Sequence, residues 1–285
     1  MVNLYLEKYG PRSCEYNFAN LFCWQDAYQY SWRLFKGRLV VYDGLSQSAF
    51  MPLGEELSTE ELVELSRYLV GNGLGPNIGV VTREYVENHP ELEVYYGISS
   101  QRDYAEYIYS TRALAQLKGN KLHKKRNLIS QFKRRYPDYR ILPMTEENKK
   151  HARALAYGLA KRRSPLSRDL QNEMAALTRA FDSFSCLNLG GILIMVQDQV
   201  VAFSIFSPLR GTPIYDIQFE KADLNFKGAG QMINWATADY LADKCEFVNR
   251  EQDLGILGLR QAKMSYDPHE LLSIYSLEFR DKKLS

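Results

Sequence analysis

Three polar side chains occupy alternate positions within residues 214–220: Asp216, Gln218 and Glu220. Alternate residues of a strand point to the same face, so the pattern predicts a strand with these three on one face and apolar residues on the other. Carboxylates placed in this way can remove a proton from an attacking group or bind a cationic side chain. Asp216 and Glu220 are therefore candidate catalytic residues, and a solvent-facing strand edge is the alternative.

A glycine-containing turn follows this strand and leads into a predicted helix over residues 231–242. Glycines at a helix start let backbone N–H groups approach an anion, where the helix dipole also favours negative charge. The turn is thus a candidate site for the phosphate end of an acyl donor, with close packing as the alternative. Its candidate binding residues are Asn225, Lys227, Gly228, Ala229 and Gly230.

Positive charge is concentrated in one segment of the chain. Residues 1–106 contain 8 Lys and Arg against 15 Asp and Glu, whereas residues 107–140 contain 10 against 1. Such a segment favours binding to phosphates or RNA, although a solvated helix face is equally compatible with it.

The periodicity of this segment predicts a helix from about Lys121 that Pro137 ends. Candidate nucleic-acid contacts are Lys121, Lys124, Lys125 and Arg126. Lys125 falls on the apolar face, where a buried ammonium requires a partner, so we expect Asp103 or Glu106 to pair with it.

A second polar segment, residues 249–253, follows a predicted strand at residues 246–249. We expect Arg250, Arg260 and Lys263 to hold a phosphate or a terminal adenosine, with Glu251 and Asp253 beside them. The alternative is an internal ion network of Arg250 with Glu251 or Asp253.

Tyr266 is a candidate acid that protonates a leaving group. The sequence contains no recognisable nucleophilic triad. Direct transfer without a covalent enzyme intermediate is therefore predicted.

The composition, with 45% hydrophobic and 25% charged residues, is typical of a soluble globular protein. The four Cys and four His residues are scattered without metal-ligand spacing, so no metal site is predicted. No apolar run is long enough to span a bilayer, and the N-terminus lacks the features of a signal peptide. These observations predict a cytoplasmic location.

Strands and helices alternate along both halves of the 285-residue chain, which predicts an α+β fold with mixed, mostly antiparallel sheets flanked by helices. We expect two domains, residues 1–136, ending in the basic helix, and residues 137–285. Among the individual elements we expect strands at residues 3–9 and 272–279, and a helix that begins at a capping box of Ser58 and Glu61. We also expect a parallel strand pair across the glycine-led helix.

The element order of the second half resembles the acyltransferase fold of the Gcn5-related N-acetyltransferases. Members of that family carry Gln/Arg-x-x-Gly-x-Gly/Ala at the turn, and here Asn225 stands in the first place before Gly228 and Gly230. The resemblance implies two tandem domains of this fold, the first degenerate, and acetyl-coenzyme A as one possible donor.

Five further motifs resemble the family named for the C-terminal domain of phosphatidylglycerol lysyltransferase. They lie at residues 15–21, 103–109, 117–127, 249–256 and 258–266. This resemblance implies transfer of an aminoacyl group from aminoacyl-tRNA to a small-molecule, lipid or peptide acceptor. Two alternatives stay open: an acyltransferase that uses acetyl- or acyl-coenzyme A, and a non-catalytic protein that binds RNA or anions.

Overall fold

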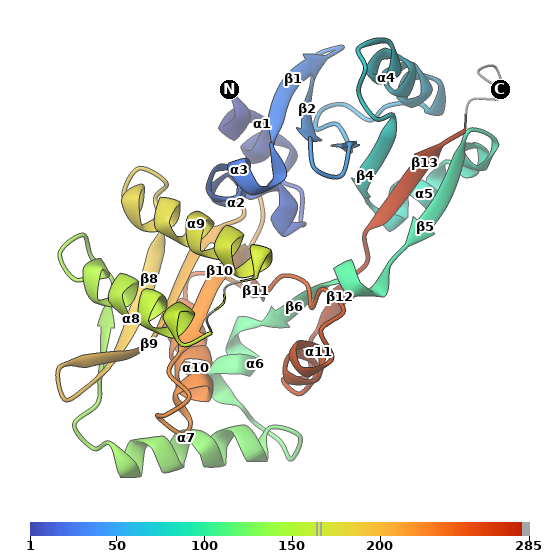
Figure 1. The fold of residues 1–285 in the computed structure, drawn as a ribbon. Helices are drawn as coiled ribbons and strands as arrows, with labels where there is room; N and C mark the ends of the chain where they lie inside the picture. The colour runs from blue at the N-terminus through green and yellow to red at the C-terminus, as the bar shows by residue number, and fades with distance from the viewer. Residues whose placement is uncertain (164, 166, 281–285) are drawn as a thin grey trace.

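Two mixed β-sheets flanked by helices make up the computed structural model, which describes residues 1–163, 165 and 167–280 (Figure 1). This confirms the predicted α+β class. None of the helices in the described part of the chain is long and apolar enough to cross a lipid bilayer.

The first sheet has six strands in the order β1-β2-β3-β4-β13-β5. Its core lies between the sheet and helix α4 (Thr59–Gly71), which begins at the predicted capping box of Ser58 and Glu61. The strands are β1 (Ser31–Phe35), β2 (Arg38–Asp43), β3 (Ser48–Phe50), β4 (Asn77–Val81), β5 (Tyr96–Ser100) and β13 (Tyr275–Phe279). The accompanying helices are α1 (Val2–Tyr9), η1 (Cys14–Tyr16), α2 (Phe18–Cys23), α3 (Gln25–Tyr28), α5 (Arg83–Asn88), η2 (Pro90–Val94) and η3 (Arg102–Tyr104).

The second sheet has seven strands in the order β12-β6-β11-β10-β9-β8-β7. They are β6 (Glu106–Ser110), β7 (Arg140–Pro143), β8 (Gly190–Val196), β9 (Gln199–Pro208), β10 (Ile214–Ala222), β11 (Phe247–Asn249) and β12 (Glu270–Leu272). One core includes residues of α6 (Thr111–Gln116), α7 (His123–Arg135) and α10 (Ala229–Leu241), and another includes residues of α8 (Lys149–Lys161) and α9 (Arg168–Asp182). Strands β10 and β11 pair in parallel across α10, as predicted.

Sheet membership crosses the predicted division at residues 136 and 137 in both directions. Strand β6 lies in the second sheet between β12 and β11, while β13 lies in the first sheet between β4 and β5. Figure 1 shows these segments as the connection between the two halves. The two halves therefore share strands, and the division into domains stays a prediction.

Two expected strands differ from the structure. Residues 3–9 lie in helix α1, because the apolar residues Val2 and Leu6 are spaced by one helical turn and Gly10 ends the helix in a left-handed conformation. The last expected strand divides into β12 and β13, which pair with different sheets.

A register shift in β10 separates two residues that we expected on one face. The shift lies between Asp216 and Phe219, and it places Ile217 in the α10 core but Phe219 in the α8 and α9 core. An extra residue in one strand reverses the alternation beyond it. The prediction that Asp216 and Glu220 share a strand face is therefore wrong.

Candidate functional site

Carboxyl groups from distant parts of the sequence meet where β6, β10 and β11 pass beside η1 and α2. Asp216 pairs in register with Asn249, and Glu251 follows two residues after Asn249. Asp216 and Glu106 are fully buried. The acid cluster consists of Glu15, Glu106, Asp216 and Glu251.

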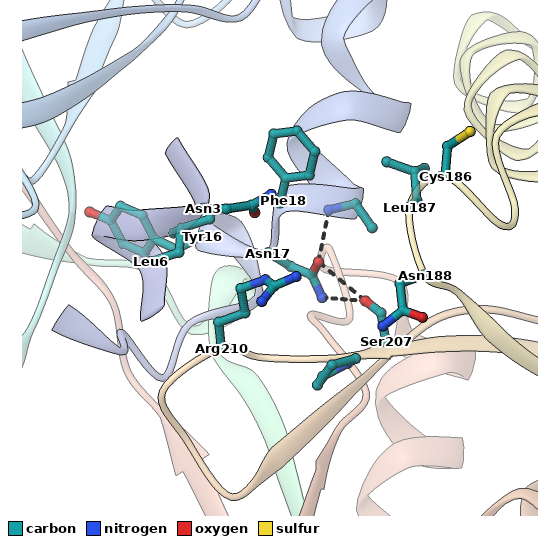
Figure 2. Close-up of a pocket in the computed structure, with 12 residues that line it drawn as sticks. Asn3, Leu6, Tyr16, Asn17, Phe18, Cys186, Leu187, Asn188, Ser207 and Arg210 are labelled. Atoms are coloured by element: carbon teal, nitrogen blue, oxygen red, sulfur yellow. Dashed lines mark hydrogen bonds between the residues drawn. The ribbon is translucent and has the colours of Figure 1, made fainter. Parts of the chain in front are cut away.

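Asparagine side chains from the N-terminal segment hold this acid cluster. Asp216 Oδ2 accepts from Asn17 Nδ2 at 3.1 Å and from Asn20 Nδ2 at 2.9 Å, and Asn20 Nδ2 also donates to Glu251 Oε1 at 3.0 Å. Asn17 is held in turn by Ala19 N and Ser207 Oγ beside a small cavity of about 70 Å³ (Figure 2). The N-terminal segment thus completes a site on the second sheet.

The acid cluster has more hydrogen-bond acceptors than donors. At or beside the acid cluster, three buried oxygens have no partner among the described residues: Asn20 Oδ1, Asp216 Oδ1 and Gln218 Oε1. The ammonium of Lys263 donates to the backbone carbonyls of residues 250, 251 and 252, at 2.5 to 3.2 Å, so it does not supply them. Because unpaired buried acceptors are costly, the arrangement fits a positively charged guest.

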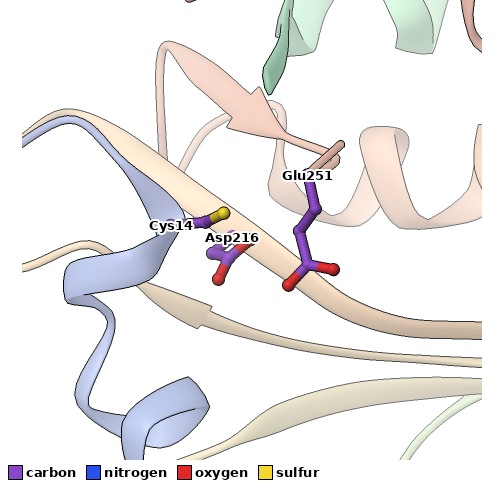
Figure 3. A group of neighbouring side chains, drawn as sticks. All are labelled: Cys14, Asp216 and Glu251. Atoms are coloured by element: carbon purple, nitrogen blue, oxygen red, sulfur yellow. The ribbon is translucent and has the colours of Figure 1, made fainter. Parts of the chain in front are cut away.

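One atom each from Cys14, Asp216 and Glu251 lies within 4.8 Å of the others (Figure 3). Their separation in the sequence hid this group from the spacing analysis, which predicted no metal site. A thiol and two carboxyls can hold a cation, whether a metal ion or a substrate ammonium.

Burial and mutual repulsion keep Glu15 and Glu251 partly protonated near neutral pH. Burial raises the pKa of Glu15 to about 8 and that of Glu251 to about 7, and it raises the pKa of Asp216 and Glu106 above their ordinary values. A cation at the site would lower these pKa values again. The acid cluster can therefore release protons when a cationic ligand binds.

A pocket of about 500 Å³ opens beside the acid cluster, between the two halves of the chain. Among the described residues that line it, none is Lys, Arg or His. Its carboxyl groups are Glu15, Asp43 and Glu251, and its aromatic residues are Trp24, Tyr28, Tyr30, Phe50 and Tyr104. Acids and aromatic faces together favour a cation. We call this space the acidic pocket.

The predicted catalytic residue Glu220 lies apart from Asp216. It forms an ion pair with Arg250 at 2.8 Å, and the amide oxygen of Asn234 accepts from Arg250 Nη1 at 2.6 Å. Tyr266 is buried, with Lys125 at 4.1 Å and Arg250 at 5.6 Å from its ring. None of Glu220, Arg250 and Tyr266 lines the acidic pocket.

Asp253 is the centre of a second buried ion network. It accepts from Arg102 at 3.1 Å, from Tyr107 at 2.6 Å and from both Nε and Nη2 of Arg260, at 3.0 and 2.8 Å. These donors hold the pKa of Asp253 well below its usual range. The network fixes the loop that carries Glu251.

Protein acceptors therefore engage all three cations that we expected to bind phosphate, Arg250, Arg260 and Lys263. The alternative prediction, an ion network of Arg250 with Glu251 or Asp253, is wrong: Arg250 pairs with Glu220, and Asp253 pairs with Arg102 and Arg260. Phosphate binding by these three residues stays a prediction.

The glycine turn packs against helix α7. Gly228 has a φ of 91°, and a Cβ added there would lie 2.7 Å from the carbonyl oxygen of Leu128. A Cβ at Gly230 would meet nothing within 4 Å, and Ala229 is buried. Asn225 lines a separate pocket of about 400 Å³, together with Arg162 and Asp223.

The predicted basic helix is present as α7, but its four candidate cations differ from one another in their contacts. Lys121 pairs with Asp267 at 2.9 Å, Arg126 donates to the carbonyls of Leu117 and Gly119, and Lys124 is exposed. The expected pairing of Lys125 with Asp103 or Glu106 is wrong. Lys125 instead lies over the Tyr266 ring, because Asp103 pairs with Arg260 and Glu106 accepts from Ser13, Cys14 and Asn249.

At the other end of α7, Lys227 from the glycine turn meets two helix cations. Arg134, Arg135, Gln131 and Lys227 surround a hollow of about 320 Å³. We call these residues the basic patch. Arg134 and Arg135 were not among the predicted site residues, although the charge distribution includes them.

Asn17, Asn20 and Trp24 were also not predicted as site residues. Asn20 lies in α2, Asn17 and Trp24 are the capping residues at its two ends, and residues 15–21 carry one of the motifs of the family resemblance. That motif was the available signal.

The two helix-flanked mixed sheets, the second with a strand–turn–helix unit, have the predicted tandem acyltransferase-like fold. The chain belongs to the family described as phosphatidylglycerol lysyltransferase, C-terminal, whose model matches residues 6–278. This confirms the resemblance inferred from the motifs. No curated protein matches the chain.

Many solved structures are similar to this chain, among them the following three. A conserved protein of unknown function from Bacteroides thetaiotaomicron is 29% identical with a TM-score of 0.89, covering 98% of this chain and 95% of its own. L-PGS from Bacillus licheniformis is 14% identical, with a TM-score of 0.70, and the match covers 99% of this chain and 91% of that one. The C-terminal domain of a putative lysylphosphatidylglycerol synthetase from Agrobacterium fabrum is 12% identical, with a TM-score of 0.67. The match covers 99% of this chain and 92% of that one. The last two share the fold.

Proposed function

We propose that this protein transfers an aminoacyl group from aminoacyl-tRNA to an acceptor by direct nucleophilic attack. The observation that carries the proposal is the surplus of buried acceptors beside the acidic pocket. An aminoacyl ester has an α-ammonium group at neutral pH, whereas an acetyl group has no charge. The names of the family and of its lysylphosphatidylglycerol synthetase relative also point to an aminoacyl donor.

The α-ammonium would lie between Asp216 and Glu251, where Asp216 Oδ1 lacks a donor. The rest of the aminoacyl group would occupy the acidic pocket against Trp24 and Tyr28. Cation–π contact and the pocket carboxyls then favour a donor with positive charge.

In the transfer, the acceptor nucleophile attacks the ester carbonyl carbon and the bond from that carbon to the ribose oxygen breaks. Glu251 takes the proton from the nucleophile and returns it to the ribose oxygen. Glu251 is chosen over the predicted bases because it lines the acidic pocket, whereas Glu220 is paired with Arg250.

The basic patch would contact tRNA phosphates, since Arg134 and Arg135 are exposed at the end of α7. A coenzyme A donor is less well supported, because α7 fills the space beside Gly228 where its phosphates were expected.

The test is filter binding of bulk tRNA at two salt concentrations, with acetyl-coenzyme A binding measured separately by calorimetry. Replacing Arg134, Arg135 and Lys227 with Gln should weaken tRNA binding and reduce the steepness of its salt dependence. Matched Gln replacements at the exposed cations Lys8, Lys150 and Arg168 should change neither. Binding of acetyl-coenzyme A without tRNA would overturn the proposal.

A further inference from the structure

A sulfur atom and two carboxyl groups converge beside the acidic pocket. Cys14 comes from η1, Asp216 from β10 and Glu251 from the loop after β11, and one ligand atom of each lies within 4.8 Å of the others (Figure 3). A tetrahedral zinc ion, with bonds of about 2.0 to 2.3 Å, separates its ligand atoms by roughly 3.5 Å. Small side-chain movements therefore bring the three atoms into the coordination shell of one ion.

A fully buried oxygen of this group lacks a donor. Asp216 is fully buried, and its Oδ2 accepts from Asn17 and Asn20, whereas its Oδ1 has no partner among the described residues. The buried Oδ1 of Asn20 also has none, although its amide nitrogen donates to both Asp216 and Glu251. Because unpaired buried oxygens are costly, the group fits a cation that accepts their electron pairs.

Outer contacts hold the side chains of the group in place. The backbone N–H of Cys14 donates to Glu106 Oε2 at 2.9 Å, and Gln252 Nε2 donates to Cys14 Sγ at 3.4 Å. Glu251 has a φ of 55°, and Lys263 of helix α11 (Leu257–Met264) donates to its carbonyl at 3.2 Å. Partners of this kind orient the ligands of a metal ion before it binds.

The mixture of ligand types selects the metal. A thiolate is a soft ligand that Mg²⁺ and Ca²⁺ avoid, whereas carboxylates are hard ligands. Zn²⁺ accepts both kinds and is bound by four ligands, of which the chain supplies three. Cys14 and Glu251 also line the acidic pocket, so an ion can enter from it and a water molecule there can complete the shell.

We propose that Cys14, Asp216 and Glu251 form a zinc site. Zinc binding requires neither tRNA nor transfer, so it is independent of the proposed function. One consequence rests on the proposed function: the carboxyls that would hold the α-ammonium cannot hold zinc at the same time. Zinc should therefore exclude the aminoacyl group and inhibit the transfer.

The test is a titration of the purified protein with Co²⁺, a spectroscopic substitute for Zn²⁺, in the presence of a phosphine reductant. The wild type should show the near-ultraviolet charge-transfer band of a cobalt–thiolate bond, and added Zn²⁺ should bleach it. Cys14→Ser should abolish the band. Cys186→Ser removes an exposed thiol elsewhere and should leave the band intact.

Zinc affinity is then measured by competition with a chromophoric chelator. Glu251→Gln should weaken zinc binding about tenfold or more, because losing a ligand costs at least as much as losing its outer partner. Glu93→Gln, which changes an exposed carboxyl, is the control. The proposal is overturned if the wild type shows no charge-transfer band or if Cys14→Ser retains it. It is also overturned if Glu251→Gln binds zinc like the wild type.

The consequence is tested by filter binding of aminoacyl-tRNA and of the same tRNA without its amino acid, each with and without zinc. The ratio of the two affinities cancels any effect of zinc on the RNA. Zinc should abolish the preference of the wild type for aminoacyl-tRNA, and a preference that zinc leaves unchanged would overturn the exclusion. A cobalt band in a protein with no such preference even without zinc would contradict the proposed function and still support the zinc site.

Discussion

Asp216 and Glu251 accept hydrogen bonds from the same nitrogen, Nδ2 of Asn20, at 2.9 and 3.0 Å. The first acid lies on β10, the second lies after β11, and the donor belongs to α2. One N-terminal amide therefore sets the separation of the two acids that we propose hold the substrate ammonium. Its own Oδ1 has no partner among the described residues, which leaves it available to the same guest.

Replacing Asn20 with Leu should remove this shared donor while filling similar space. The fully buried carboxyl of Asp216 and the half-buried carboxyl of Glu251 then each lose a hydrogen bond, so the free energy of unfolding should fall by about 1 to 3 kcal/mol. Urea denaturation measures the change. Leu at the exposed Asn127 is the control and should stay within about 0.5 kcal/mol of the wild type. An Asn20→Leu protein as stable as that control would contradict the described bonding.

The stability of the ligand-free protein should fall as the pH rises. The folded-state pKa of Glu15 is raised from 4.5 to about 8, so the folded protein binds more protons than the unfolded chain between these values. Stability is thus lost progressively from about pH 4.5 to pH 8. Glu251, raised to about 7, acts in the same direction.

Urea denaturation at several pH values measures this dependence, and Glu15→Gln should make it shallower. Glu55→Gln is the control, since Glu55 is exposed on the surface. A slope that Glu15→Gln leaves unchanged would show that this carboxyl is not buried and protonated as described.

Alanine at the two glycines of the turn should have opposite effects. Gly228→Ala places a Cβ against the Leu128 carbonyl at a positive φ, and should destabilise the fold by about 1 to 3 kcal/mol. Gly230→Ala adds a Cβ to open space in a helix and should stabilise it by about 0.5 to 1 kcal/mol. Thermal or urea unfolding distinguishes the two. Equal effects would argue against close packing of α7 on Gly228.

The buried pair of Arg250 and Glu220 should behave as a coupled unit. Arg250→Met leaves the Glu220 carboxylate without its cation and should cost about 3 to 5 kcal/mol. The double variant Arg250→Met with Glu220→Gln should recover much of that loss, because neither charge then remains. A double-mutant cycle in urea measures the coupling. Additive losses would mean that the two side chains do not interact.

Local patterns were enough to predict α7 and the capping box of α4, because helical periodicity and capping depend on neighbouring residues. The family motifs also pointed to the fold. The register shift in β10 was not predictable, because strict alternation in the sequence gives no sign of an extra residue in the pairing.

Long-range contacts limited the prediction of the site. Asn17 and Asp216 are 199 residues apart, and only the packing of the N-terminal segment on the second sheet brings them together. The same holds for Cys14 and Glu251.

The central claim is that the acidic pocket recognises an ammonium-bearing acyl group, and one comparison tests it most directly. Bulk tRNA charged with amino acids is divided in two, and one half is treated with acetic anhydride to remove the positive charge of the aminoacyl group. Filter binding then compares the untreated aminoacyl-tRNA, the acetylated aminoacyl-tRNA and uncharged tRNA, which has no amino acid attached. The comparison is made for the wild type and for Glu251→Gln.

The account predicts that the wild type binds the free aminoacyl-tRNA more tightly than the acetylated form, which should bind like uncharged tRNA. Glu251→Gln should reduce this preference while leaving the binding of uncharged tRNA intact. Equal affinity of the wild type for the free and acetylated forms would contradict the claim. The protein would then be an RNA-binding protein on an acyltransferase-like fold.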